Sequence, residues 1–469
     1  MKRWAKAPQL NAYLTVFLSL SLSVLLGVFL FLIQAALVGH SKMKLECVTD
    51  IGMNSVLGEF HRELLEQYDL LFVDLSYGSA SGGIAQAQSH LTGFIAENLQ
   101  TAPYTVSAWN KLKLDEARIT ATLMAHHYDG KILKRQACAY ISENAKAGAV
   151  SDVKDLLSEA VKLDAKDEIA SWIETMNTIG TLLASLTKTA RQEALEADPD
   201  ADVSGIEVSL DNPASGDFDE AMAMLASFSD DSGGGAITLS DYYSHRGAAV
   251  AGPGRAGYEE DIVGKVADDH LFRRYLFEKM GRHMNLKEGS RLDYQIEYII
   301  AGKNSDKKNF NSIKSRIFAW RFADNARLYL ESKEKQYAAE AIAKTVTALL
   351  LVPELAESVK YALLFSWAFH DTTKDIKTIF DGGKIPLVKE SIGSTRNGID
   401  YPQYLELMLL LQWEKNTIAR AMDIIEMDIR QTPGNRYFRI DQCMEGFRAT
   451  INYHDSYEQY TIDRRYGYY

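Results

Sequence analysis

Cysteine and proline are both scarce in this sequence. Proline accounts for only 9 of the 469 residues, which is consistent with a helix-rich fold because proline interrupts helices. The three cysteines, Cys47, Cys138 and Cys443, are too few for a disulfide scaffold. Their odd number leaves at least one unpaired if two of them join within the chain. The sequence allows a disulfide between Cys138 and Cys443 without indicating one.

Known catalytic motifs are absent from the sequence. The strings Gly-x-Ser-x-Gly, His-Glu-x-x-His and Cys-x-x-Cys do not occur, which removes common signatures of hydrolases, zinc proteases and thiol redox sites. His126 and His127 end a predicted strand, where adjacent side chains point to opposite faces, so we interpret them as a surface pair and not as metal ligands. No nucleophile and base stand out as a pair. We therefore expect no catalytic residues and no enzymatic activity.

Outside the N-terminus, basic residues are fewer than acidic ones. The formal net charge is −12, and Lys2, Arg3 and Lys6 contribute +3 within the first 13 residues, so the remainder carries −15. Such an acidic body argues against nucleic acid or anionic lipid as its ligand. No small-molecule substrate is evident from the sequence. The length of the chain predicts two or three domains.

One long apolar segment follows the basic N-terminus. Residues 14–33 contain no charge, and the apolar run continues to Val38 with Gln34 as its only strongly polar interruption. Twenty helical residues span about 30 Å, the thickness of the hydrocarbon core of a bilayer. A secretory signal has a shorter apolar stretch and a small-x-small cleavage site, which residues 37–40 do not provide. We therefore predict an uncleaved, single-pass anchor over residues 14–38.

The flanking charges predict the orientation of this anchor. Basic residues without acidic ones precede it, so the short N-terminus is expected to stay in the cytoplasm. A long domain translocates largely regardless of its charge. We therefore expect the protein at the cell membrane, with the C-terminal domain outside the cytoplasm.

Small side chains recur every four residues within the anchor, at Thr15, Ser19, Ser23 and Gly27. This spacing places them on one helix face, where small residues let two membrane helices approach closely. We interpret the stripe as a transmembrane packing face. The alternative is that the hydroxyl groups bond to their own backbone and that the stripe has no partner.

The remaining sequence predicts an α+β fold that is predominantly helical. Apolar residues at a period near 3.6 indicate helices, and short alternating runs indicate strands. We expect helices over residues 40–74, 84–98, 131–144, 151–163, 167–186, 259–284, 308–332, 335–351, 353–369 and 401–430. We expect strands over residues 118–125 and 292–300, and a hairpin over 439–453 and 457–465.

Shifts in composition suggest five regions along the chain. They are a cytoplasmic tail (1–13), the transmembrane anchor (14–38), a stalk helix with a first ectodomain part (39–195), an acidic Gly/Ser-rich insertion or linker (196–257) and a C-terminal α+β ectodomain part (258–469). The insertion is expected to carry one short helix near residues 218–228.

One string in the insertion resembles a calcium-binding loop. Asp200, Asp202, Ser204 and Asp211 fall at positions 1, 3, 5 and 12 of an EF-hand-type loop. Position 8, which is normally apolar, is Glu207, and aspartate at position 12 reaches less far than glutamate. Acidic linkers give such matches by chance, and the defects favour that interpretation. Calcium is the one cofactor that the sequence leaves open.

Seven strings together resemble a known family. They are LTVFLSL (14–20), EQYDLLFVD (66–74), YQIEYIIAGKNSD (294–306), DGGKIPLVK (381–389), YPQYLELMLLL (401–411), RAMDIIE (420–426) and FRIDQC (438–443). They resemble an uncharacterised family of single-pass membrane proteins of Gram-positive bacteria that is associated with Tad (Flp-type, type IVc) pilus loci. The N-terminus is similar to the TadE/TadG pseudopilin-like segment. The resemblance implies other membrane-anchored pilus or secretion subunits as partners.

Two departures from that family pattern bear on processing. Ala12 and Tyr13 stand where members often carry glycine, and the run from Gln34 to Leu37 replaces an ending with glutamate and arginine. Cleavage after Ala12 would make Phe17 the fifth mature residue, where pilin packing commonly uses glutamate. These departures from the pattern favour a permanently anchored accessory subunit.

Three functional hypotheses follow from the sequence. The first is an extracytoplasmic structural or assembly subunit, pseudopilin-like, of a Tad-type pilus or secretion apparatus. The second is an extracytoplasmic binding or sensing module that depends on calcium through residues 200–211. The third, a surface hydrolase, has the least support because no catalytic constellation is visible.

Overall fold

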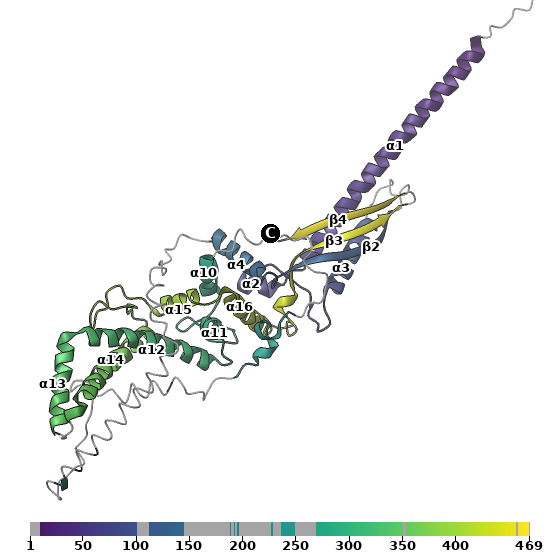
Figure 1. Ribbon diagram of the computed structural model, residues 1–469. Helices are drawn as coiled ribbons and strands as arrows, with labels where there is room; N and C mark the ends of the chain where they lie inside the picture. Colours follow the sequence, from purple (N-terminus) through teal and green to yellow (C-terminus); the bar gives the residue numbers. More distant parts are fainter. Residues whose placement is uncertain are drawn as a thin grey trace, which may run out of the picture. The chain divides into compact units, whose positions relative to one another are not determined.

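The computed structural model describes residues 10–100, 112–144, 236–248, 269–349, 353–455 and 458–468, together with positions 188, 192, 195, 196 and 227 (Figure 1). The chain forms two compact units. Unit 1 comprises Met1–Gln136, Ala248–Lys265 and Thr432–Tyr469, and unit 2 comprises Ala137–Gly247 and Val266–Gln431. This division differs from the expected succession of regions along the chain, because unit 1 combines segments from both ends.

Unit 1 is built around a four-stranded antiparallel sheet. Its strands are β1 (Val73–Asp74), β2 (Lys113–Met124), β3 (Cys443–His454) and β4 (Gln459–Gly467). The central strand β3 pairs with β2 on one side and with β1 and β4 on the other. Pairing of β3 with β2, from near the opposite end of the chain, is what makes unit 1 discontinuous in sequence. The predicted strand at 118–125 and the predicted C-terminal hairpin are confirmed.

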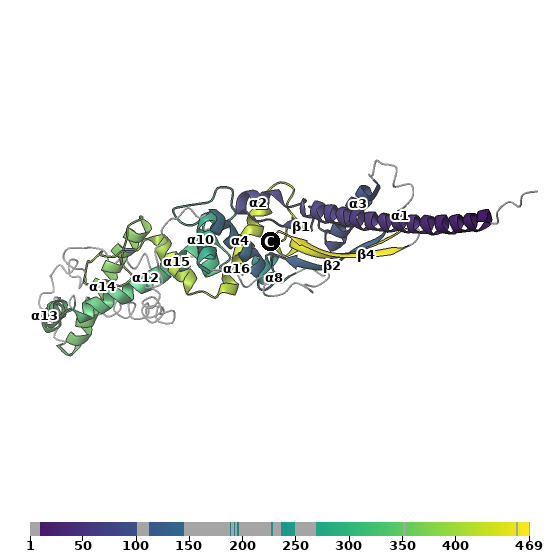
Figure 2. The same ribbon diagram turned by 90° about the horizontal axis from the view of Figure 1, so that it is seen from above.

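Two helices pack on the sheet of unit 1 through one hydrophobic core. Helix α1 (Leu10–Leu57) contributes Leu45, Val48 and Val56, and helix α3 (Ile84–Gln100) contributes Leu91 and Ile95. The sheet contributes alternate residues of β3, as expected when one face is buried: Phe447, Ala449, Ile451 and Tyr453. Both views show α1 continuing beyond this sheet (Figures 1 and 2).

The predicted helix over 40–74 is too long. Helix α1 ends at Leu57, and a separate short helix, α2 (Arg62–Tyr68), precedes β1. His61 begins α2 because its Nδ1 accepts a hydrogen bond from the Leu64 amide at 3.2 Å. Asp69 ends it in the left-handed conformation, with φ of 51°. The apolar periodicity runs through this interruption and hides it.

Unit 2 is helical in the part that the structure describes. Its longer helices are α10 (Asp269–Lys279), α11 (Gln295–Ala301), α12 (Asp306–Glu331), α13 (Lys333–Leu349), α14 (Ala356–Phe380), α15 (Tyr401–Leu410) and α16 (Glu414–Ile429). A short strap, residues 236–247, contains the 3-10 turn Leu239–Asp241 and the single-turn helix α8 (Tyr243–Arg246). Helix α4 (Lys131–Asn144) lies across the point where the chain passes from unit 1 to unit 2.

Two element predictions in unit 2 are wrong. The predicted strand at 292–300 is helix α11, in which Gln295 to Ile300 are all buried, so the alternation of polar and apolar residues does not mark an exposed face. The predicted helix over 401–430 is two helices, which are separated at Leu411 to Trp413. Trp413 has extended backbone angles and begins α16. The two sequence regions 151–163 and 167–186, predicted as helices, lie outside the described residues.

Candidate functional site

The N-terminal half of α1 exposes a continuous apolar surface. Sixteen large hydrophobic side chains between Tyr13 and Ile33 are exposed, from 41% at Ile33 to 80% at Tyr13. Within the described chain, α1 is the one helix long and apolar enough to cross a membrane, with a mean hydropathy of 2.7 over its best window. A membrane anchor and a signal sequence both have this length and composition. This surface, residues 13–33 of α1, is the candidate site.

The predicted stripe lies on this exposed half. Thr15, Ser19, Ser23 and Gly27 are all within α1, so their four-residue spacing places them on one helix face. The Ser19 hydroxyl donates a 2.9 Å hydrogen bond to the Val16 carbonyl of its own helix. A methyl group added at Gly27 would meet nothing within 4 Å. The Ser19 hydroxyl thus bonds to its own backbone, as the alternative interpretation expects, and the surface at Gly27 is open.

The C-terminal half of α1 is buried in unit 1 along one face. Ser41, Leu45, Thr49, Met53 and Val56 are buried, at helical spacing. The same face brings Gly52 against α3, where an added methyl group would lie 2.6 Å from Cγ1 of Ile95. Glycine is needed here for close approach of the two helices, not for its backbone freedom.

Polar contacts fix α1 to its neighbours in unit 1. The hydroxyls of Thr49 and Tyr453 lie 2.7 Å apart in the core, and burial raises the pKa of Tyr453 to about 12, so this phenol stays protonated. Lys44 Nζ donates to the Leu99 carbonyl at 3.1 Å, in the last turn of α3. The Tyr468 hydroxyl donates to the Leu57 carbonyl at the end of α1. One continuous helix thus joins the apolar surface to a folded sheet.

Acidic residues of α1 also meet β4. Arg464 on β4 lies 3.5 Å from Glu46 and 3.7 Å from Asp50, both on α1. These side chains are partly exposed, so each ion pair adds little to stability.

The histidine pair does not have the predicted geometry. His126 and His127 lie in a turn after β2, where Tyr128, Asp129 and Gly130 all have positive φ. Their rings are therefore close together, with centroids 4.7 Å apart, instead of on opposite faces. His127 Nδ1 accepts a hydrogen bond from the Met124 amide at 3.2 Å, which occupies one ring nitrogen. Burial lowers the pKa of His126.

Two further predictions concern the cysteines and the string that resembles a calcium-binding loop. All three cysteines lie in the described chain, where Cys47 is exposed, Cys138 and Cys443 are buried, and no disulfide joins any of them. The suggested disulfide between Cys138 and Cys443 is therefore not present. Asp200, Asp202, Ser204 and Asp211 lie outside the described residues. Among the residues that are described, no group of three or more His, Cys, Asp or Glu is placed to hold a metal ion.

A buried ionic network in unit 2 was not foreseen from the sequence. Asp375 on α14 accepts hydrogen bonds from Lys389 Nζ at 2.7 Å and from Arg321 Nε at 3.1 Å. Arg321 also donates to the carbonyls of Pro386 and Leu387 at 2.8 and 2.7 Å. The string DGGKIPLVK therefore provides an extended segment that is fastened to α12 and α14. Because these charges bond to one another inside the unit, we assign them a structural role.

Acidic residues of α16 hold the strap over residues 236–247. Asp423 accepts from the Ser244 amide and from the Tyr298 hydroxyl, each at 2.8 Å, and burial raises its pKa. The Glu426 carboxylate accepts hydrogen bonds from the two terminal guanidinium nitrogens of Arg246, at 2.7 and 2.9 Å. The string RAMDIIE thus supplies two buried carboxylates that accept hydrogen bonds from the strap, and both hold the strap against α16.

Glu297 is the remaining buried carboxyl group of note. Its Oε1 accepts from the His283 amide at 2.9 Å and from the Tyr401 hydroxyl at 2.7 Å. Burial raises the pKa of this carboxyl, and these two hydrogen bonds, with the nearby Arg282, oppose the shift only in part. The side chain is fully buried and belongs to the core of unit 2.

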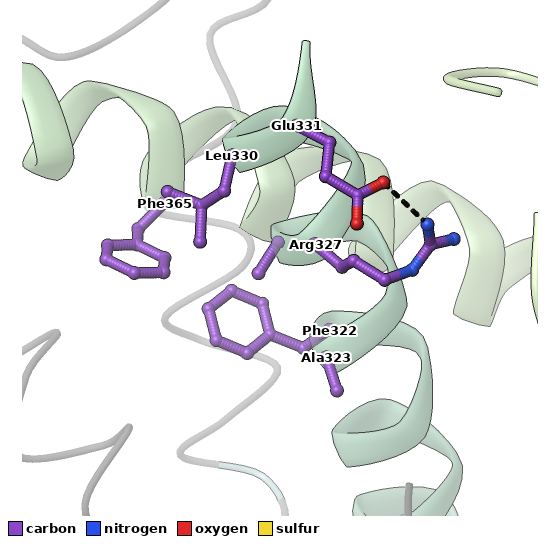
Figure 3. A pocket seen from close by; sticks show the side chains of 7 residues that line it. Phe322, Ala323, Arg327, Leu330, Glu331 and Phe365 are labelled. Carbon is purple, nitrogen blue, oxygen red and sulfur yellow. Dashed lines mark hydrogen bonds and ion pairs between the residues drawn. The ribbon is translucent and has the colours of Figure 1, made fainter. Parts of the chain in front are cut away.

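One open groove is formed by α12 and α14 (Figure 3). It has a volume of about 470 Å³ and is lined mainly by apolar side chains, including Phe322, Leu330 and Phe365. Arg327 and Glu331 lie at its margin and pair with each other at 2.9 Å. The groove therefore suits an apolar occupant better than a charged ligand.

Comparisons with known proteins place the chain in a family without supplying a function. No curated protein matches it, and neither does any solved structure. A model of a "family of unknown function (DUF5702)" matches residues 218–455, just over half of the 469 residues. The matched region includes most of the described part of unit 2 and the central strand β3. The chain belongs to this family of unknown function (DUF5702).

Proposed function

We propose that the protein is a membrane-anchored structural or assembly subunit, pseudopilin-like, of a Tad-type pilus or secretion apparatus. The observation that carries the proposal is the division of α1 into an exposed apolar half and a half buried in the core of unit 1. A subunit of this kind acts by packing against other subunits and needs no reaction centre.

The exposed apolar half of α1 is stable only in an apolar environment, not in water. Burying a large apolar side chain is worth about 1.5–3 kcal/mol, so the sixteen exposed ones represent on the order of 20 kcal/mol or more. Lipid provides such an environment, and so do neighbouring helices in a membrane or a filament. The small residues Thr15, Ser19, Ser23 and Gly27 favour helix contacts on one side.

Continuity of α1 supports an anchor that is retained. The helix passes through residues 34–40 without interruption, and its buried face begins at Ser41. Removal of the apolar half would leave the buried half in place but would detach unit 1 from the membrane. The basic residues before the helix favour a cytoplasmic N-terminus, and in that orientation both units lie outside the cytoplasm.

The interior of unit 2 is stabilised by ionic contacts within the unit. Its buried acids at positions 375, 423 and 426 bond to basic or hydroxyl groups of the same unit. We expect the outer surfaces of both units to dock other membrane-anchored subunits. These partners are proteins, in keeping with the acidic character of the chain.

The packing face can be tested in native membranes. Ser19→Leu, Ser23→Leu and Gly27→Leu combined should abolish co-purification of membrane partners, because leucine keeps the helix apolar but prevents close approach. Ser21→Leu is a matched control, since Ser21 lies on another face and bonds to Leu18 of its own helix at 3.0 Å. Unchanged complexes in the triple variant would contradict this interface.

The orientation needs a separate experiment. Protease added to intact cells should degrade the large C-terminal part and leave only the anchor with its N-terminal tail. Full protection of that part would show that it lies in the cytoplasm, and recovery of the mature chain from the medium would show that the helix is a cleaved signal.

A further inference from the structure

We propose that the turn over residues 282–285 is a pH-sensitive latch, which the uncharged ring of His283 holds closed against unit 2 and which acidification releases. The latch lies within unit 2, between α10 and α11. It does not depend on the proposed pilus function.

The His283 ring lies in a box of four aromatic rings, each from a different part of unit 2. The ring centroids of Phe310 on α12 and of Tyr401 on α15 are 4.8 and 5.5 Å from that of His283. Those of Phe380, at the end of α14, and of Tyr294, immediately before α11, are 5.6 and 6.1 Å away. The imidazole therefore joins the turn to four helices at once.

The turn itself has a strained backbone. Arg282 and Asn285 exchange two backbone hydrogen bonds of 2.9 Å each, so His283 and Met284 are the two central residues of a tight turn. Met284 has a φ of 70°. A turn with positive φ at this position favours glycine or asparagine, because the Cβ atom of other residues is crowded there. The turn therefore depends on its attachment to the rest of unit 2 and relaxes when that attachment is lost.

The base of the turn is fixed independently of the His283 ring. The Gly281 amide donates to Gln295 Oε1 at 2.8 Å, and the Gly281 carbonyl accepts from the Ile296 amide at 3.0 Å. These groups carry no charge at any ordinary pH. Loss of the ring contacts therefore frees the tip of the turn and leaves its base attached to α11.

The groups that face the imidazole disfavour its protonation. Burial lowers the pKa of His283 below the ordinary value of 6.5, and Lys314 on α12 lowers it further, whereas a hydrogen bond to the Phe380 backbone opposes the shift only in part. Tyr294 and Tyr401 present neutral phenols, because burial raises the pKa of both. The contribution of the ring to stability is therefore fully present above pH 6.5 and is lost as the pH falls through the pKa of the folded chain.

Two further charged groups contact the turn outside the aromatic box. Glu297 Oε1 accepts from the His283 amide at 2.9 Å, and a terminal guanidinium nitrogen of Arg282 donates to the Phe277 carbonyl at 3.0 Å. Glu297 also titrates, but burial raises its pKa, so its protonation favours the folded chain. Release of the turn by acid is therefore the signature of His283 and not of Glu297.

Electron paramagnetic resonance of a spin label beside the turn tests the proposal in the full-length, detergent-solubilised protein. The label is attached at Leu286→Cys, because Leu286 is 56% exposed. Cys47→Ser removes the exposed native cysteine, and the other two cysteines are buried. The mobile fraction of the label should rise at least about twofold from pH 8 to pH 5 and should fall again on return to pH 8. A label at Ser391→Cys, in another exposed loop of unit 2, should show no such change.

Variants of the box assign the release to His283. His283→Phe keeps an aromatic ring but removes the titrating group, so the mobile fraction should no longer vary with pH. Lys314→Met removes the cation that opposes protonation of the imidazole, so release should move to lower pH. Lys333→Met, at an exposed position of α13, is the matched control and should leave the midpoint unchanged. Glu297→Gln should keep the release. An equally ordered turn at pH 8 and pH 5 in the wild type, or a release that persists in His283→Phe, would overturn the proposal.

Discussion

Thr49 on α1 and Tyr453 on β3 share a 2.7 Å hydrogen bond between residues that are 404 positions apart in the chain. The bond is buried and joins the helix that carries the apolar surface to the central strand of the sheet. Because α1 is continuous, the orientation of its exposed half is set by contacts of this kind in unit 1.

Removal of either hydroxyl should destabilise unit 1. Thr49→Val and Tyr453→Phe should each lower the free energy of unfolding by about 1 kcal/mol, because each leaves one buried hydroxyl without its partner. The double variant should lose little more than either single one. Urea denaturation of detergent-solubilised protein measures the effect. Thr92→Val, whose hydroxyl bonds only to Gln88 of its own helix in the described structure, should change it by less than about 0.5 kcal/mol.

The close approach of α1 and α3 gives a second prediction. Gly52→Ala should destabilise unit 1 by about 1–3 kcal/mol, because its methyl group would overlap Cγ1 of Ile95. Gly93→Ala is the matched control on α3, since nothing lies within 4 Å of the added methyl group. It should stabilise the protein by about 0.5–1 kcal/mol, as expected for alanine in an open helix position. Equal effects of the two substitutions on the unfolding midpoint would refute this packing.

The elements that the sequence predicts well are those with one consistent pattern. The strand at 118–125, the C-terminal hairpin and the helix at 84–98 follow a regular period of apolar residues. The strand predicted at 292–300 fails because Gln295 and Glu297 are polar but buried. Their partners, Asp428 and Tyr401, are more than 100 residues away. Alternation alone does not distinguish such buried polar residues from an exposed face.

The candidate site also has features that the sequence predicts and features that it does not. The exposed apolar half of α1 follows from composition, and its buried half follows from periodicity. Pairing of β3 with β2 brings residue 443 and the residues after it beside the N-terminal part of the chain, and no local pattern shows that. Nor does any local pattern show the network of Arg321, Asp375 and Lys389, because each of these residues reads as an ordinary charged position on a surface.

That network gives a third prediction. Lys389→Met should lower the free energy of unfolding by about 3–5 kcal/mol, because it removes the ammonium that contacts both oxygens of buried Asp375. Lys384→Met removes a side chain that is 63% exposed and weakly paired with Asp400, so it should cost less than about 0.5 kcal/mol. Tryptophan fluorescence during guanidinium titration reports the change through Trp320, which is buried in unit 2. Comparable midpoints for the two variants would contradict a structural role for the network.

Glu297 gives a prediction about pH. Burial raises its pKa above the ordinary value of 4.5, so the folded chain binds this proton more tightly than the unfolded chain does. Its contribution to stability is therefore fully present below pH 4.5 and is lost as the pH rises through the folded pKa. Glu297→Gln keeps an acceptor for the His283 amide and the Tyr401 hydroxyl but carries no charge at any pH. The variant should be at least as stable as the wild type at pH 8, and this advantage should shrink as the pH falls toward 4.5.

Only the difference between the two proteins isolates Glu297, because other carboxyls titrate over the same range. Urea denaturation of both chains at intervals from pH 4.5 to pH 8 gives that difference directly. Glu390→Gln removes a carboxylate whose side chain is 60% exposed, and it serves as the control for loss of a surface charge. A Glu297→Gln variant that is less stable than the wild type at pH 8 would show that burial does not dominate and that the charged form is stabilised, chiefly by the hydrogen bonds from the His283 amide and the Tyr401 hydroxyl. An advantage that grows toward acid would reverse the sign of the linkage and would exclude a raised pKa.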